Sequence, residues 1–323
     1  MPITQLKNSE LSALQPLFLD VFKQPISVAL LDWKYGEVSS RNGAGGESWV
    51  SVEDAQTQAP RLHCGLLFRN LHWRGASCRG AQLIDLMAAP KETGLARDSS
   101  DFHQIMQHVL QRLRRPEPLI AFGFPSERAL RLAIKLGVST NIDQLYRLIW
   151  AGRPRKASWL RFGRVQRLPA LDRAVCNHLW AAMQASLSEH CVGDRTYEYL
   201  RYRYEQHPEK SYEFVMVMRP FSSKPLGLGV LSGEGTTREI LDIVACKDDY
   251  PRVIDGLRRW ALQNDLDNLH LYATTCVVSQ LTETGATAEA TAIRVMASPL
   301  ESAGTLAELK NNWWLTGGDT DYH

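Results

Sequence analysis

The sequence predicts an α/β fold made of two tandem domains, each a central mixed β-sheet flanked by helices. Apolar runs of strand length alternate with segments whose apolar residues recur at helical spacing. The length of 323 residues exceeds what a single hydrophobic core usually serves. The second half also repeats motifs of the first in the same order, and so long a repeat indicates two copies of one domain.

The first domain, residues 1–150, is expected to be rich in strands. A helical pattern over 11–22 precedes two strands within 59–75, which we expect to be joined by a turn near Arg69–Asn70. The continuous apolar run over 81–90 is typical of a buried central strand. The remaining expected elements are a helix over 100–115 with Ser100 or Asp101 as its N-cap, a strand over 118–125, a helix over 126–137 that ends at Gly137, and a strand over 141–152.

Residues 151–170 differ in composition from the chain on either side. They contain six basic residues, no acidic residue, two prolines and two glycines. We interpret this segment as a basic linker between the first domain and a second domain at 171–323. Such a linker could also bind the acidic surface of an acyl carrier protein.

The internal repeat is weak but ordered. The motif "LLDWKYGE" (30–37) is echoed by "YLRYRYEQ" (199–206), and "LIDLMAAPKETG" (83–94) by "ILDIVACKDDYP" (240–251). The second match aligns Asp85 with Asp242. The glycine of the first segment has no counterpart in the second, so we predict that the second copy is degenerate at this loop.

Composition and charge exclude several classes of protein. A net charge of +2 demands neither a nucleic acid nor an acidic partner. No basic leader and no long apolar segment is visible, which predicts a cytoplasmic protein without membrane contact. The sequence shows no HExxH motif and no CxxC pair, so we expect no metal site. The six cysteines are widely scattered: Cys64, Cys78, Cys176, Cys191, Cys246 and Cys276.

The segment "KETGLA" (Lys91 to Ala96) lies between an apolar strand and the start of a helix. Unpaired N–H groups at a helix N-terminus carry partial positive charge and bind anions. A glycine at position 94 allows several of these groups to converge on one phosphate. Taken alone, the segment also fits an ordinary strand–helix connection.

The context of this loop resembles the GCN5-related N-acetyltransferase (GNAT) superfamily. The order of "DLMAAPKETGLA", an amphipathic helix and "AFGFPSERALRLAIKLGV" is similar to the family's fourth strand, pyrophosphate loop, fifth strand and following helix. The tail "WWLTGGDTDYH" resembles the ends of tandem GNAT proteins. The resemblance implies an acyl-CoA-dependent N-acyltransferase, which would transfer an acetyl group, or another acyl group, to an amine of a small molecule or peptide.

The resemblance also implies a set of cofactor-binding residues. The backbone after Asp85 would pair with the pantetheine arm, the loop would hold the pyrophosphate, and Ser126 would stand near the thioester end. The predicted cofactor-binding residues are Met87, Ala88, Ala89, Lys91, Glu92, Thr93, Gly94, Leu95, Ala96, Arg97, Ser126 and Arg128. The cosubstrate would be acetyl-CoA or another acyl-CoA.

The catalytic residues are less clearly indicated. The family's general-acid Tyr aligns with Ala133, which has no proton to donate, so a non-catalytic acyl-CoA-binding or scaffold protein is the alternative function. An amine acceptor must lose a proton, and Asp85 is the first candidate base; a structural, hydrogen-bonded Asp is the other interpretation. Asp319, in a polar and flexible tail, is the second candidate. Trp33 and Tyr35 are candidates for the acceptor pocket, or for anchoring a helix on the sheet.

Overall fold

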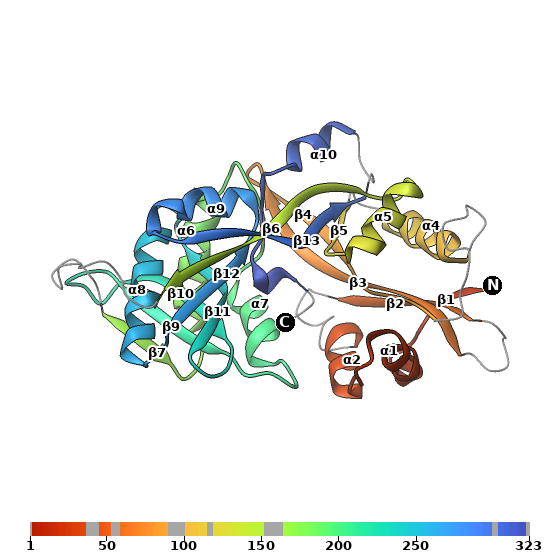
Figure 1. Ribbon diagram of the computed structural model, residues 1–323, viewed down its shortest axis with the longest axis horizontal. Coiled ribbons are helices and arrows are strands. Elements are labelled where there is room, and N and C mark those ends of the chain that lie inside the picture. The colour runs from red at the N-terminus through yellow and green to blue at the C-terminus, as the bar shows by residue number, and fades with distance from the viewer. Residues whose placement is uncertain are drawn as a thin grey trace.

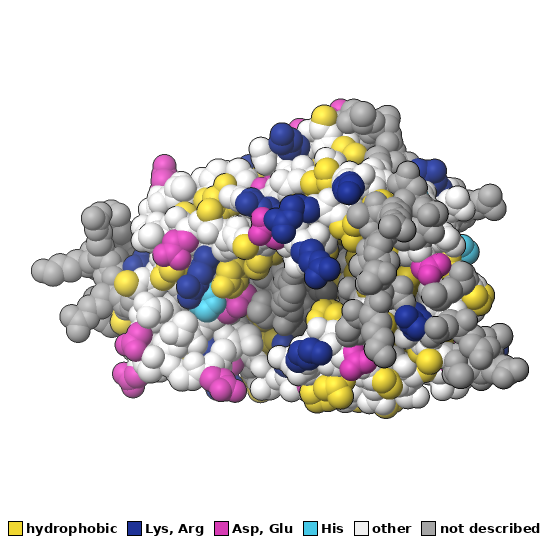
Figure 2. All heavy atoms as spheres, turned by 45° about the vertical axis from the view of Figure 1, so that its right-hand side comes forward, with side chains coloured by type: hydrophobic (Ala, Val, Ile, Leu, Met, Phe, Trp, Pro, Cys, Tyr) yellow, Lys and Arg dark blue, Asp and Glu magenta, His cyan; other side chains and the backbone are white. Residues whose placement is uncertain are grey.

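The computed structural model describes residues 2–36, 45–52, 59–89, 101–114, 119–151, 164–298 and 303–320. Within these residues the strands form one large mixed sheet, and helices cover both of its faces (Figure 1). The predicted mixed α/β class is therefore confirmed. Over the face displayed in Figure 2, basic and acidic side chains lie interspersed, as the small net charge leads one to expect.

The first half follows the predicted order over 101–151, but two strands stand where three were expected over 59–90, and the strands over 3–5 and 46–52 were not expected. Its helices are η1 (Asn8–Leu14), α1 (Gln15–Phe22), α2 (Val28–Tyr35), α4 (Asp101–Leu113) and α5 (Glu127–Lys135). Its strands are β1 (Ile3–Gln5), β2 (Gly46–Val52), β3 (Pro60–Trp73), β4 (Ala76–Ala88), β5 (Leu119–Gly123) and β6 (Thr140–Ala151).

The second half contains a similar mixture of strands and helices. Its strands are β7 (Val165–Leu168), β8 (Cys191–Gly193), β9 (Glu213–Met218), β10 (Pro225–Ser232), β11 (Thr237–Ala245), β12 (Asn268–Ala273), β13 (Thr287–Ala297) and β14 (Trp313–Trp314). Its helices are α6 (Arg173–Ser186), α7 (Tyr197–Leu200), the π-helical η3 (Arg201–Glu205), η4 (Lys247–Asp249), α8 (Tyr250–Gln263), α9 (Thr275–Leu281), η5 (Thr282–Thr284), α10 (Ala303–Leu309) and η6 (Gly317–Asp319).

The turn expected near Arg69–Asn70 was placed wrongly. Strand β3 continues through these residues, and the hairpin to β4 turns at Arg74 and Gly75. Both turn residues have positive φ, 53° and 73°, as a two-residue hairpin loop of type I′ requires. The polar side chains of Arg69 and Asn70 suggested a turn at that point, but Gly75 sets the position of the hairpin turn.

Part of the segment interpreted as a linker is also structured. Its residues Val165–Leu168 form β7, which pairs with β9 at the edge of the sheet. Residues 152–163 of the segment lie outside the described part of the chain. The basic composition that suggested a linker therefore extends into an edge strand, where exposed cations are common because they discourage further strand pairing.

The two halves exchange strands at the middle of the sheet. The order there is β5, β13, β6, β12, so each half contributes a strand that lies among those of the other (Figure 1). Met296 of β13 pairs with Gly123 of β5, and Ala297 pairs with Phe122. Residues 146–151 of β6 pair with β12. Because β6 and β13 also pair with each other along most of their length, one continuous sheet joins the halves.

Two cores lie on opposite faces of the first half of the sheet. Helices α4 and α5 cover one face, where Leu83 of β4 is buried with Phe102. Helices α1 and α2 cover the other, where Ile84 and Met87 are buried with Leu31. The α1–α2 side also faces the second half of the chain, so α2 is placed between the sheet and the junction of the halves.

Candidate functional site

Strand β4 has a β-bulge at Asp85. Its pairing with β3 goes from Ile84 opposite Gly65 to Met87 opposite His63, so β4 contains one residue more than β3 over this interval. Asp85 has a φ of 45°, in the left-handed region that residues other than glycine rarely adopt. Bulges re-aim side chains, and strained residues of this kind cluster at functional sites. This bulge directs the Asp85 carboxylate toward α2.

The Asp85 carboxylate is buried and fully engaged by two neighbouring residues of α2. Lys34 Nζ lies 3.0 Å and 2.9 Å from its two oxygens, and the Tyr35 hydroxyl donates to Oδ2 at 2.6 Å. Ser27 caps α2 by accepting a hydrogen bond from the Leu30 N–H, which fixes where the helix begins. The Tyr35 ring lies against the backbone of Gly65, where any larger residue would collide with it.

These contacts determine the charge of the site. Burial alone would raise the pKa of Asp85, but the Lys34 ammonium and the hydrogen bonds from Tyr35 and Lys34 outweigh it and hold that pKa below its usual value. Asp85 is therefore an ionised carboxylate and a weak base. The sequence suggested Asp85 as the base that accepts a proton from the amine. This environment favours that role less than a role in which Asp85 stays ionised and holds positive charge.

Two further groups surround the bulge on the β3 side. His63 is buried, and its Nδ1 donates to the Asp85 carbonyl at 2.7 Å, so Nε2 accepts from Ser48 at 3.0 Å. Burial lowers the pKa of His63, which keeps the imidazole neutral. Burial also raises the pKa of the Cys64 thiol to about 12, and a thiol this weakly acidic is a poor nucleophile.

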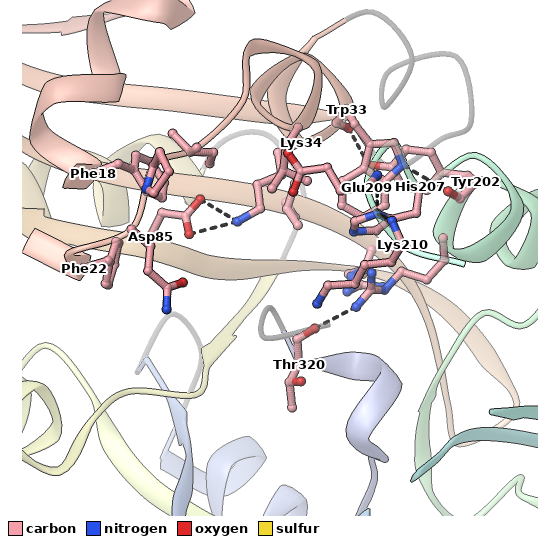
Figure 3. Close-up of a pocket in the computed structure, with 17 residues that line it drawn as sticks. Phe18, Phe22, Trp33, Lys34, Asp85, Tyr202, His207, Glu209, Lys210 and Thr320 are labelled. Atoms are coloured by element: carbon pink, nitrogen blue, oxygen red, sulfur yellow. Dashed lines mark hydrogen bonds and ion pairs between the residues drawn. The ribbon is translucent and has the colours of Figure 1, made fainter. Parts of the chain in front are cut away.

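A cavity of about 480 Å³ lies beside Asp85, between α1–α2 and the segment 202–210 of the second half (Figure 3). One wall is apolar and is formed by Phe18, Phe22 and Ile26. The opposite wall is polar and cationic. Its residues from the second half are Tyr202, Arg203, His207, Glu209, Lys210 and Thr320.

Trp33 and Tyr202 join the two halves at this cavity. Their rings stack with centroids 5.0 Å apart and planes 17° from parallel. Trp33 Nε1 donates to the Tyr202 carbonyl at 3.1 Å, and the Tyr202 hydroxyl donates to the Trp33 carbonyl at 2.8 Å. The two residues occupy equivalent places in the repeated motifs "LLDWKYGE" and "YLRYRYEQ", so the contact is nearly symmetric.

The second half reproduces the aspartate arrangement with different partners. Asp242, aligned with Asp85 in the sequence, is fully buried and accepts a hydrogen bond from the Tyr204 hydroxyl at 3.0 Å. Tyr204 is the counterpart of Tyr35. The cation is different: Arg195 pairs with Asp242 at 2.8 Å and also with Asp319 at 2.7 Å. Each aspartate therefore accepts a hydrogen bond from the tyrosine that the sequence repeat aligns with that of the other half.

The C-terminal tail is not flexible at Asp319, contrary to our expectation. Asp319 is 4% exposed, and its carboxylate also accepts from the Thr316 N–H at 2.9 Å. A charge removed from water requires a partner, and Arg195 supplies one. Thr320 is among the residues lining the cavity, whereas Asp319 points to Arg195.

The tail also covers one edge of β11. Strand β11 pairs with β12 only from Thr237 to Glu239, which leaves the rest of that edge without a strand. Thr316 bridges to Ala273 of β12, and a Cβ on Gly318 would come within 2.8 Å of the Leu241 carbonyl oxygen. Residues 315–318 therefore lie between the diverging ends of β11 and β12.

The corresponding edge of β4 is open in the described residues. Strands β4 and β5 are parallel and pair from Arg79–Leu119 to Leu83–Gly123. Beyond Leu83, residues 84–88 of β4 have no strand partner on the β5 side in the part of the chain that is described. No described strand pairs with the backbone groups on that side.

The predicted cofactor residues fall into three groups. Met87, Ala88 and Ala89 follow the bulge, with the Met87 side chain buried in the core and the two alanines partly exposed. Ser126 caps α5 through the Ala129 N–H at 3.3 Å, and Arg128 is exposed on the same helix. The loop residues Lys91, Glu92, Thr93, Gly94, Leu95, Ala96 and Arg97 lie outside the described residues.

The two acceptor-pocket candidates differ in position. Trp33 lines the cavity, whereas Tyr35 is not among the lining residues and donates to Asp85, which is. Sequence reasoning missed Lys34, Arg195 and Arg203. Lys34 and Arg203 stand inside the quoted aromatic motifs, and the alternation of aromatic and basic residues was a signal that was not used for them.

Solved structures of other proteins share this architecture. An Enterococcus faecalis protein described as a probable N-acyltransferase superposes with a TM-score of 0.71, at 12% identity over 96% of this chain and 73% of its own. A GCN5-related N-acetyltransferase from Kribbella flavida gives a TM-score of 0.63, at 16% identity over 92% and 70%. The fold is that of the GCN5-related N-acetyltransferases. The GNAT resemblance seen in the sequence is therefore supported across nearly the whole chain.

A third similar structure contains a ligand. Saccharomyces cerevisiae N-myristoyltransferase with bound myristoyl-CoA gives a TM-score of 0.56, at 8% identity over 98% of this chain and 85% of its own. Neither the models of known protein families nor the curated proteins give a match to the sequence. The likeness therefore concerns the GNAT fold, and it does not by itself assign a substrate.

The described residues contain neither a metal-binding cluster nor a membrane-spanning helix. No group of three or more His, Cys, Asp or Glu side chains in the described ranges is arranged to hold a metal ion. Among the helices whose residues are described, none is both long enough and apolar enough to cross a bilayer.

Proposed function

We propose that this protein is an acyl-CoA-dependent N-acyltransferase whose acceptor amine binds in the cavity beside Asp85. The observation that carries this proposal is the edge of β4 beyond Leu83, which β5 leaves unpaired immediately after a bulge in a GNAT fold. By resemblance to that family, the backbone of residues 86–89 pairs with the pantetheine arm. The pyrophosphate is held by the loop Lys91–Arg97.

The second half supports the site without binding a second cofactor. Its equivalent edge of β11 is covered by residues 315–318 of the tail, and its loop lacks the glycine of the first copy. It contributes one wall of the cavity instead, through Tyr202 and the residues that follow it. Ligand sites at the junction of two domains are common because such junctions leave concave surfaces.

The proposed reaction is direct acyl transfer. The amine nitrogen attacks the thioester carbonyl carbon, the C–S bond breaks, the thiolate of CoA leaves, and the nitrogen loses a proton. The Asp85 carboxylate, held in position and neutralised by Lys34 and also bonded by Tyr35, accepts a hydrogen bond from the attacking nitrogen. The Ala89 N–H is not an oxyanion donor in this arrangement, because it already donates to the Arg61 carbonyl at 2.8 Å. The proton passes to solvent through the cavity.

One feature favours the alternative, a protein that binds acyl-CoA without transferring the acyl group. Ala133 replaces the tyrosine of the family's helix and is itself buried, at 6% exposure. The thiolate must then leave without a proton from this helix. CoA thiolate is a fair leaving group, so the missing hydroxyl slows the reaction without preventing it.

The decisive experiment measures cofactor binding and thiol release separately. Calorimetry with acetyl-CoA and longer acyl-CoAs tests binding, and a thiol assay with a panel of amines tests transfer. A Gly94→Glu variant should lose acyl-CoA affinity, because a carboxylate in the loop repels pyrophosphate. A Gln263→Glu variant, at an exposed position at the end of α8, adds the same charge and is the control. Absence of acyl-CoA binding would overturn the proposal, and binding without thiol release for any amine would favour the alternative.

A further inference from the structure

The cavity contains a buried cation that no carboxylate of the described residues neutralises. Arg203 is 3% exposed and lines the cavity from the second half. Its Nε donates to the Gly318 carbonyl at 3.2 Å and its Nη2 to the Thr320 carbonyl at 3.0 Å. Its Nη1 is buried and has no hydrogen-bond partner within 3.5 Å in the described part of the chain, although the buried Tyr212 hydroxyl lies near the guanidinium. Buried guanidinium groups are ordinarily paired with an anion, because the cost of desolvation is otherwise uncompensated.

The internal repeat explains why the Arg203 guanidinium has no carboxylate partner among the described residues. Arg203 is the counterpart of Lys34, which neutralises Asp85 in the first half. In the second half, Asp242 is neutralised by Arg195, which comes from a different place in the chain. Arg203 is therefore not paired with the aspartate and lines the cavity, where it donates to the Thr320 carbonyl.

The titratable groups around Arg203 in the cavity are the cation Lys210, the carboxylate Glu209 and the neutral imidazole of His207. Lys210 and His207 line the same part of the cavity, and His207 stacks on Trp33 with centroids 4.7 Å apart. Burial, together with Arg203, Lys210 and Lys34, lowers the pKa of His207 to about 4. Burial and Arg203 also lower the pKa of Lys210. Burial is the main cause of both shifts, and the nearby cations add to it, while Glu209 acts in the opposite direction on Lys210.

We propose that Arg203 binds an anionic group of the acceptor, a carboxylate or a phosphate, while the acceptor's amine faces Asp85. This proposal rests on the proposed function. It defines the acceptor as a zwitterion whose positive end meets the Asp85 side of the cavity and whose negative end meets the Arg203 side. The apolar wall of Phe18, Phe22 and Ile26 accommodates a hydrophobic substituent between them. Each half of the chain thus supplies recognition of one end of the acceptor.

The ligand-side test uses the wild-type protein and matched probes. Phenylalanine is compared with phenylalaninamide, which keeps the amine and the ring but lacks the carboxylate, and phosphoethanolamine with ethanolamine. Binding is followed by NMR shifts of the His207 imidazole, whose pKa should rise when an anion neutralises Arg203. Removal of the anionic group should weaken binding about tenfold or more, as loss of a charge-assisted bidentate contact does. A loss between phenylalanine and phenylalaninamide identifies a carboxylate as the preferred group. A loss between phosphoethanolamine and ethanolamine identifies a phosphate.

The protein-side test compares two arginines of the same helical segment. Arg203→Met should remove the preference for the anionic probe, whereas Arg201→Met removes the same charge from an exposed position and should preserve it. Arg203→Lys, which retains a charge, is used if the methionine variant fails to fold. That variant should bind the anion more weakly than wild type but more tightly than the neutral probe.

The outcomes separate this inference from the proposed function. Equal binding of the acid and its amide, no binding of any anionic probe, or unchanged binding in Arg203→Met would overturn the anion site. Thiol release with neutral amines as efficient as with zwitterions would overturn it while leaving N-acyl transfer intact. Binding of anions at Arg203 without thiol release would sustain the site and count against transfer.

Discussion

Trp33 and Tyr202 hold the two halves of this chain together by the same contact made in both directions. Each side chain donates a hydrogen bond to the other's backbone carbonyl, and the rings stack between the two bonds. Because the residues are equivalent in the internal repeat, the junction has approximate two-fold symmetry, like the isologous interface of a dimer. The cavity lies at this junction, so the contact also sets its shape.

The first prediction concerns the stability of that junction. Trp33→Ala should lower the free energy of unfolding by about 3–5 kcal/mol, because a large buried side chain is removed. Tyr202→Phe keeps the ring and should cost only about 1 kcal/mol for the lost hydrogen bond. Urea unfolding measures both. Equal effects of the two changes would contradict the view that stacking, rather than the hydroxyl bond, dominates the contact.

The second prediction uses the two equivalent tyrosines. Tyr35→Phe and Tyr204→Phe each remove a hydroxyl bond to a buried aspartate, and each should cost about 1 kcal/mol of stability. Only Tyr35→Phe should reduce thiol release, since Tyr35 positions Asp85 beside the cavity. Rates are measured at saturating acyl-CoA, and the Tyr204→Phe variant is the control. A similar loss of rate in both variants would show that reduced stability, and not the position of Asp85, causes the loss.

The third prediction concerns the Lys34–Asp85 pair and pH. Asp85 has a depressed pKa in the folded protein, so its ionisation contributes stability above the unfolded value of about 3.9, and this contribution is lost as pH falls through the folded pKa. In Lys34→Met, burial dominates and raises the pKa of Asp85, so the variant should be destabilised most at neutral pH.

The loss of stability expected for Lys34→Met has a defined size and a matched control variant. Breaking a buried pair from one side typically costs about 3–5 kcal/mol, and we expect that loss at pH 7 to 8 in urea unfolding. The deficit should shrink as the pH is lowered toward 5, where Asp85 of the variant can become protonated. Arg131→Met removes an exposed cation paired with Glu127 and should change stability by less than about 0.5 kcal/mol. A deficit that is constant with pH would show that Asp85 does not govern it.

The fourth prediction is that each chain binds one acyl-CoA. The open edge of β4 gives one site, whereas residues 315–318 cover the equivalent edge of β11. Asp319→Asn weakens the pairing with Arg195 and should destabilise the protein while leaving the stoichiometry and affinity for acyl-CoA unchanged. Titration calorimetry gives both numbers. Two equivalents bound by the wild-type protein would contradict a closed second groove.

Several features of the fold and site could be predicted from the sequence because they depend on local patterns. The helix over 101–113 and its buried stripe follow from apolar spacing, and the end of α5 follows from Gly137, whose φ is 66°. The match between Asp85 and Asp242 was visible in aligned motifs, and each aspartate does accept a hydrogen bond from the equivalent tyrosine. The glycine loop at 91–96 remains a sequence-based prediction.

The tertiary structure decided which charges are neutralised and which are left over. Lys34, Arg195 and Arg203 are alike in sequence as basic residues near aromatics, yet one pairs with Asp85, one with Asp242 and Asp319, and one lines the cavity. These partners are 47 to 124 residues apart along the chain. Local periodicity carries no information about pairings at such distances, because they depend on how helices, loops and the C-terminal tail pack on the sheet. The sequence by itself determined the domain type, and the folded chain determined where its charges meet.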